Sequence, residues 1–217
     1  MGFGLDDGLD FPARLGRTLH DTTVRNAAVP GYGTVQSRAL YLKHLQDNPA
    51  PDVIIYGLVD YHDARNAGTR AWLHALERAG GHHPWRGVPW AWWDGSDLHF
   101  YAPHAYQHWP ASEWSAVVNL VELASIDVRD RTLRTKTETT IQTILRWRQD
   151  AKEARFVVAL LYAPTRHRAY IRRLQEQGIE VVDLRESGYP AAAIPVDGHP
   201  DASVHLSWAS KLAEVLQ

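Results

Sequence analysis

Four short apolar runs along the chain have the character of buried strands. They are rich in aliphatic side chains, are bounded by polar or turn residues, and cover residues 22–29, 52–59, 154–163 and 179–184. Continuous apolar runs of this length are typical of parallel strands that are covered on both faces. The pattern therefore predicts a mostly parallel sheet that contains these four segments.

Segments with helical spacing of apolar residues lie before, between and after these runs. They cover residues 10–19, 34–46, 62–80, 112–124, 132–153, 165–178 and 202–217. Asp10 and Thr34 are the expected N-caps of the first two, and Pro12 suits a first helical turn. Strands that alternate with helices predict an α/β fold.

Residues 80–110 interrupt this alternation with five Trp and five His. Within them, residues 90–101 are expected to form a small hairpin that turns at Asp94–Ser96. We expect one domain over residues 1–217, with 80–110 as an inserted cap at the carboxyl ends of the strands, where open α/β sheets bind ligands. The Trp side chains suit either a small buried core or a platform for sugar rings.

Composition narrows the function classes without choosing one. The chain has 217 residues, 45% of them hydrophobic, and a formal net charge of −2. We expect no nucleic-acid partner, because no basic stretch stands out. We expect no membrane segment in this chain, because no apolar run approaches the eighteen residues of a spanning helix. No cysteine is present, which excludes disulfides and thiolate nucleophiles. No cofactor is indicated, and localisation and oligomeric state stay open.

The stretch 26–37, NAAVPGYGTVQS, combines a strand end with a helix start. Asn26 closes the predicted strand, and Gly31 and Gly33 separate it from the helix that follows. Free backbone N–H groups at a helix start suit an anion or an oxyanion. The alternative is an ordinary turn that needs glycine for its backbone angles.

Two further stretches place polar side chains after predicted strands. In residues 56–66, polar side chains that include His62 and Asn66 follow a predicted strand and can converge on a site at its carboxyl end. The alternative is that Asp60 or Asp63 simply caps the helix that follows. In residues 195–205, Asp197 stands two positions before His199, ahead of the last helix. An acidic residue beside a histidine can orient a catalytic base, although Asp-Gly is also a strong turn signal. His205 suits helix packing.

Together, NAAVPGYGT, YGLVD and DGHP resemble blocks II, III and V of the SGNH (GDSL-type) hydrolases, in the family's order along nearly the whole chain. The VPGYGT-x-Q form is similar to a bacterial subgroup linked to surface polysaccharide. The resemblance implies a three-layer α/β/α sandwich with a mostly parallel, flavodoxin-like sheet. It also implies acyl transfer through a serine ester, with His199 as base, Asp197 as its orienter and the Gly31 N–H as an oxyanion donor.

The chain departs from the family pattern in two of these blocks, DGHP and YGLVD. The acid–base pair is spaced Asp-x-His rather than Asp-x-x-His, a shorter form that resembles acetyltransferases of polysaccharide systems. Val59 stands where the family has an oxyanion-donating Asn, and a valine side chain donates nothing. Loss of one such donor typically costs about 10²–10³ in rate, unless Asn66 or His62 replaces it.

The nucleophile of the family's first block, Gly-Asp-Ser, is not found in the chain. The opening MGFGLDDGLDFPARL resembles the sequence that usually follows this block in the family. The resemblance therefore puts the serine about three residues before Met1. We therefore expect an N-terminally truncated chain with the first strand missing. The alternative is a shortened relative that has lost hydrolysis.

Two functions follow as expectations. The first is an esterase or O-acyltransferase acting on a small-molecule or saccharide ester. The second is a non-catalytic carbohydrate- or partner-binding protein on the same scaffold. A metal site in the His-rich insertion is a weaker idea, because no dense ligand spacing such as HExxH occurs.

Overall fold

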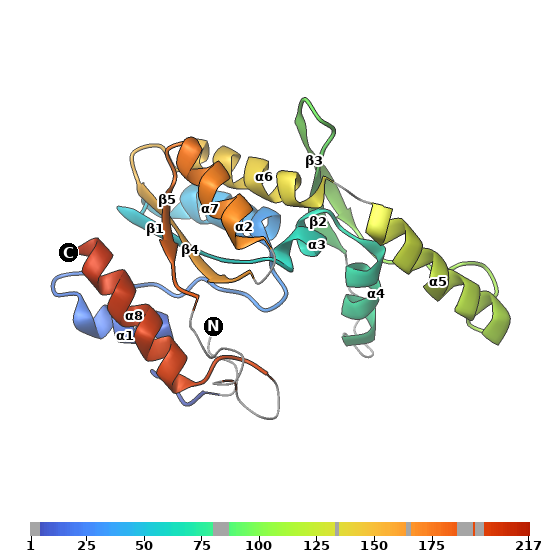
Figure 1. The fold of residues 1–217 in the computed structure, drawn as a ribbon, viewed down its shortest axis with the longest axis horizontal. Coiled ribbons are helices and arrows are strands. Elements are labelled where there is room, and N and C mark those ends of the chain that lie inside the picture. The colour runs from blue at the N-terminus through green and yellow to red at the C-terminus, as the bar shows by residue number, and fades with distance from the viewer. Residues whose placement is uncertain (1–4, 80–86, 133–134, 164–165, 186–192, 194–197) are drawn as a thin grey trace. The chain divides into compact units, whose positions relative to one another are not determined.

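The computed structural model describes residues 5–79, 87–132, 135–163, 166–185, 193 and 198–217 (Figure 1). The chain falls into two compact units. Unit 1 comprises residues 1–30, 55–59 and 156–217, and unit 2 comprises residues 31–54 and 60–155. Both units are therefore built from segments that are distant in sequence.

Unit 1 is organised around a three-stranded sheet in the order β1-β4-β5. The strands are β1 (Val53–Val59), β4 (Arg155–Tyr162) and β5 (Glu180–Asp183). β4 and β5 run parallel, with Val157 opposite Glu180 and Leu160 opposite Asp183. Parallel neighbours require a crossover, and α7 (His167–Glu176) supplies it and contacts β5. Three of the four predicted strands are thus confirmed.

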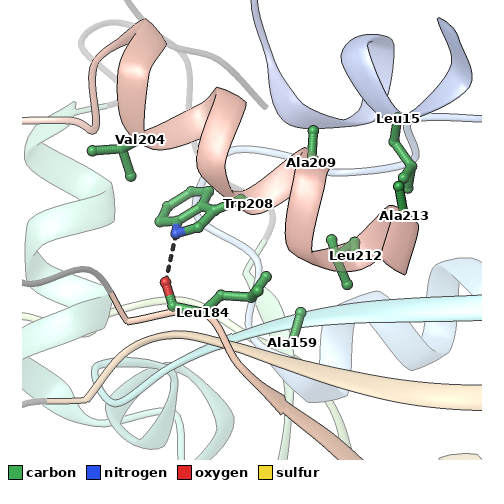
Figure 2. Close-up of a cluster of buried hydrophobic side chains, with 8 residues drawn as sticks. All are labelled: Leu15, Ala159, Leu184, Val204, Trp208, Ala209, Leu212 and Ala213. Atoms are coloured by element: carbon green, nitrogen blue, oxygen red, sulfur yellow. Dashed lines mark hydrogen bonds between the residues drawn. The ribbon is translucent and has the colours of Figure 1, made fainter. Parts of the chain in front are cut away.

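Helices α1 (Phe11–Thr18) and α8 (Ala202–Leu216) lie against each other in unit 1. Both begin at aspartate caps, since Asp10 accepts a hydrogen bond from the Ala13 N–H and Asp201 accepts from Ser203 and Val204. Figure 2 shows their apolar side chains packed onto the sheet, with the Trp208 indole N–H donating to the Leu184 carbonyl at 2.7 Å. The buried cluster consists of Leu15, Ala159, Leu184, Val204, Trp208, Ala209, Leu212 and Ala213.

The prediction of a strand at residues 22–29 is wrong. These residues form no helix or strand, and only Val24 and Val29 among them are even partly buried. Val24 packs against the α1–α8 cluster, while the rest of the segment is exposed. A strand needs a hydrogen-bonding neighbour as well as an apolar composition. The described part of the structure provides this segment with none.

Unit 2 consists of five helices and a hairpin in its described residues. The helices are α2 (Thr34–Asp47), α3 (His62–Asn66), α4 (Arg70–Ala79), α5 (Ala116–Thr132) and α6 (Lys136–Asp150). Helices α2, α3 and α6 contact one another and β2, and α4 contacts α5. A second apolar cluster joins α4 and α5 to the hairpin through Leu73, Leu76, Val88, Tyr106 and Ile126.

The hairpin is confirmed at the predicted place. Strand β2 (Val88–Trp93) pairs antiparallel with β3 (Leu98–His104), and Trp93 lies opposite Leu98. The Asp94 carboxylate accepts hydrogen bonds from the backbone N–H groups of Ser96 and Asp97, at 2.8 and 2.9 Å. A short polar side chain that bonds the backbone ahead of it is a common way to close such a turn.

The single helix predicted over residues 62–80 is wrong, because the chain forms two helices there. Gly68 ends α3 with a φ of +55°, a conformation that side chains rarely adopt. A methyl group on Gly68 would also lie 3.0 Å from Trp90, so the hairpin packs tightly against this turn. Similarly, the N-cap of α2 is Gly33 rather than Thr34.

The structure therefore confirms an α/β fold with a mostly parallel sheet, while the three-layer sandwich stays a prediction. None of the helices in the described part of the chain combines the length and the apolar content that a bilayer crossing requires.

Candidate functional site

The two glycines of the loop that leads into α2 differ in what their backbone N–H groups contact among the described residues. Gly31 adopts a φ of +79°, and its N–H hydrogen-bonds to no other described residue. The Gly33 N–H, in contrast, donates to the Gln36 Oε1 at 2.7 Å. Of the two predicted glycines, Gly31 is therefore the one whose N–H is available to an oxyanion.

Asn66 is fully buried and ties the glycine loop to helix α6. Its Oδ1 accepts a hydrogen bond from the Val35 N–H at 3.1 Å. Its Nδ2 donates to the hydroxyl oxygens of Thr34 and Thr140, each at 2.9 Å. Both amide hydrogens are thus engaged inside unit 2, and the side chain satisfies an N–H in the first turn of α2.

Arg65 and Gln36 add a second set of ties between the same loops. The Arg65 guanidinium donates to the Tyr32 carbonyl at 2.8 Å, and the Gln36 side-chain amide donates to the Arg65 carbonyl at 3.4 Å. The same amide donates to the Pro89 carbonyl of β2 at 2.6 Å. The guanidinium also lies over the rings of Tyr61 and Trp72, at 4.6 and 4.7 Å from their centroids. Hydrogen bonds thus hold residues 31–36 and 60–66 together within unit 2.

His62 and Asp63 are buried beside this network. Burial, with a smaller contribution from Arg65, lowers the pKa of His62 to about 3, so the imidazole is neutral at pH 7. The Asp63 carboxylate accepts hydrogen bonds from the hydroxyls of Thr137 and Thr140, both at 2.6 Å. A buried carboxylate held in this way connects α3 to α6.

The remaining predicted site residues belong to unit 1. His199 is exposed, and Asp197 lies outside the described residues. Asn26 is exposed too, and its Oδ1 accepts a hydrogen bond from the Ala28 N–H at 3.1 Å. The structure therefore gathers Gly31, Gly33, His62 and Asn66 in one unit, while the assignment of His199 and Asp197 as an acid–base pair stays a prediction. His205 is buried and accepts a hydrogen bond from the Phe11 N–H, as expected of a packing residue.

The structure also reveals a polar cluster that the sequence did not suggest, around Glu122 of α5. Its Oε1 accepts hydrogen bonds from the Tyr106 hydroxyl at 2.6 Å and from the Trp109 N–H at 3.0 Å. Burial raises the pKa of Glu122, but the hydroxyls of Tyr106 and Ser112, the Trp109 N–H and His108 outweigh burial and lower it. Glu122 is therefore a buried carboxylate that stays ionised at neutral pH.

A hollow of about 410 Å³ lies beside this cluster. It is lined by His74, Arg78, His108, Ser112, Glu113, Asn119 and Leu123. None of the site residues predicted from the sequence lines it. In the sequence, the one sign of this cluster is an acidic residue, Glu122, within an otherwise apolar helical segment. Helical spacing alone does not tell which face of that helix points inward.

No family model, no curated protein and no solved structure matches the chain. Within the residues that the structure describes, no group of three or more His, Asp or Glu side chains is arranged to hold a metal ion. His99, a member of the predicted His cluster, pairs instead with Asp94 at 2.8 Å.

Proposed function

We propose that the chain belongs to an SGNH-type serine esterase or O-acyltransferase that acts on an ester, with carbohydrate-linked esters as one substrate class. The observation that carries the proposal is the Gly31 N–H, which has no described partner and stands at the turn before α2. The ties between residues 31–36 and 60–66 support it, because they hold this donor in place before a substrate arrives.

The proposed reaction is acyl transfer in two steps. A serine hydroxyl, the nucleophile that the family resemblance implies, attacks the ester carbonyl while His199 takes its proton. The carbonyl oxygen becomes an oxyanion that the Gly31 N–H stabilises, and His199 returns the proton to the departing alcohol. Water or a sugar hydroxyl then takes the acyl group. Asp197 orients His199, whereas Asn66 supports the loop rather than the oxyanion, because Thr34 and Thr140 use its amide hydrogens.

The test is hydrolysis of p-nitrophenyl acetate by the protein purified from its source. We expect His199→Ala to lower kcat by at least about 10³, because the base is lost while binding remains. His20→Ala is the matched control, since His20 is also an exposed histidine of unit 1. Equal activity of the two variants, each with an unchanged circular dichroism spectrum, would refute the assignment.

A second candidate, a non-catalytic carbohydrate-binding protein, is favoured by the hairpin. The rings of Trp90 and Tyr101 stack with their centroids 4.1 Å apart, and Phe100 and Tyr101 are each 41% exposed. Exposed aromatic rings on a hairpin can pack against sugar faces. Oligosaccharide binding that is lost in Tyr101→Ala but retained in His199→Ala, with no turnover, would favour this function over the first.

A further inference from the structure

Helix α5 has an unusual orientation, because Glu122 and Asp130 are buried beside Ile126, whereas most of its large apolar side chains are exposed. Six large apolar side chains on and just before it are exposed: Trp114, Val117, Leu120, Val121, Leu123 and Val128. They are six of the eleven large hydrophobic residues that are exposed in the described part of the chain. We call this set the α5 face.

Two buried carboxylates fix this orientation. Glu122 is held by Tyr106 and Trp109, as described above. Asp130, eight positions or just over two helical turns later, accepts hydrogen bonds from the backbone N–H groups of Arg70 and Ala71, at 3.3 and 2.8 Å. These contacts cap the start of α4, which lies beside α5 (Figure 1). Rotating α5 to bury its apolar side would break both sets of contacts.

The α5 face has the spacing of a helix-packing seam. Within the helix, Val121 and Val128 are seven positions apart, and Val117 and Ala124, which alternate with them, are also seven positions apart. This is the a/d spacing with which two helices interlock their side chains. Asp127 is the one charged residue between positions 114 and 128 whose side chain is exposed. A surface of this kind matches an apolar helix, and α5 of another molecule offers one.

The exposed area suits a protein interface. Scaled by exposed fractions between 40% and 88%, the six side chains present roughly 600 Å² of apolar surface. On typical monomers the largest exposed apolar patch covers at most ~600 Å², so the α5 face is as large as such patches become. It also approaches the ~800 Å² of surface that each partner buries in a standard interface.

A lipid surface fits less well. Helices that lie on membranes carry Lys and Arg on the polar side, where they meet anionic headgroups. In α5 the carboxylates of Glu122 and Asp130 are buried instead. The helix contains no lysine, and its two arginines, at positions 129 and 131, stand only near its C-terminal end.

We propose that the α5 face is a homodimer interface, in which α5 packs against α5 of a second copy of this chain about a two-fold axis. The two copies then present the same side chains to each other, as an isologous interface requires. This inference does not depend on the proposed enzymatic function.

Light scattering after size-exclusion chromatography tests the proposal. We expect the wild-type chain to elute with twice its mass of 24.5 kDa, and Leu120→Glu to elute as a monomer. A buried, unpaired carboxylate in the interface is expected to weaken association by at least about 100-fold. Leu120 is 69% exposed, so the monomer should keep its melting temperature. Leu206→Glu is the matched control, because Leu206 is an exposed leucine of α8 and its variant should remain dimeric.

The absence of cysteine from the chain permits a second, independent measurement. A single Leu120→Cys variant should form a disulfide-linked dimer on mild oxidation, and Leu206→Cys should not. A wild-type monomer at 100 μM with equal cross-linking of the two variants would overturn the proposal. Flotation of monomeric protein with phosphatidylcholine–phosphatidylserine vesicles would also overturn it, and would assign the α5 face to lipid.

Discussion

Gly33→Ala tests the network that ties the glycine loop to α3 and α6. Gly33 has a φ of −109°, which alanine adopts freely, so its backbone sets no requirement for glycine. The added methyl group would instead lie 2.6 Å from Asn66 Oδ1, 3.0 Å from Arg65 Cβ and 3.2 Å from Gln36 Oε1. Because Asn66 is fully buried, its carboxamide has to move for the methyl group to fit.

The cost follows from the three hydrogen bonds of that carboxamide. Each contributes about 1 kcal/mol, so displacing the group costs about 3 kcal/mol. Replacing glycine lowers the entropy of the unfolded chain, which stabilises the variant by about 0.4–1 kcal/mol. The free energy of unfolding should therefore fall by about 2–3 kcal/mol.

Urea denaturation followed by circular dichroism measures this change, and a double-mutant cycle identifies its cause. In an Asn66→Ala background the clash with Oδ1 is absent, so Gly33→Ala should cost less than about 1 kcal/mol there. Gly95→Ala is the control for backbone strain without a clash. Its φ is +113° and nothing lies within 4 Å of the added carbon, so we expect a loss of about 1 kcal/mol. Additive effects of Gly33→Ala and Asn66→Ala would refute the reasoning.

Three further predictions concern other contacts. Trp208→Phe removes the indole N–H that donates to the Leu184 carbonyl, and should lower the free energy of unfolding by about 1–3 kcal/mol in urea denaturation. Asp130→Ala removes the cap of α4, and should lower the melting temperature through a loss of about 1–2 kcal/mol. Stability should also fall as the pH drops from 6.5 towards 4. Burial holds the pKa of His62 at about 3 and that of His205 at about 4, so the unfolded chain takes up protons first. Urea titrations at pH 7, 5.5 and 4 measure this loss, and equal midpoints would contradict it.

Local signals predicted the elements whose causes are local. The hairpin turn at residues 94–97 is closed by the Asp94 side chain, and α1 starts at the Asp10 cap, so neighbouring residues suffice to define both. Segment 22–29 has an apolar composition suited to a strand but lacks a described neighbour to pair with, and pairing is a property of the fold.

The candidate site shows the same division. Gly31 and Gly33 marked the turn that leads into α2, because a turn depends on neighbouring residues. The role of Asn66 was not predictable, because its partner Thr140 lies 74 positions away in the sequence. Helix α5 posed a further difficulty, since its face with the large apolar residues would ordinarily be expected to point inward.

The hydrogen bonds around Asn66 also limit which amino-acid substitutions the chain can accept. Thr34, Val35 and Thr140 meet at one carboxamide, so a change at position 66 leaves two hydroxyl groups and a backbone N–H without their partner at the same time. A valine at position 140 would in turn leave both Asn66 and Asp63 short of a hydrogen bond. Substitutions at positions 34, 63, 66 and 140 should therefore be inherited together, and an alignment of descendants of this sequence should show them as one covarying group.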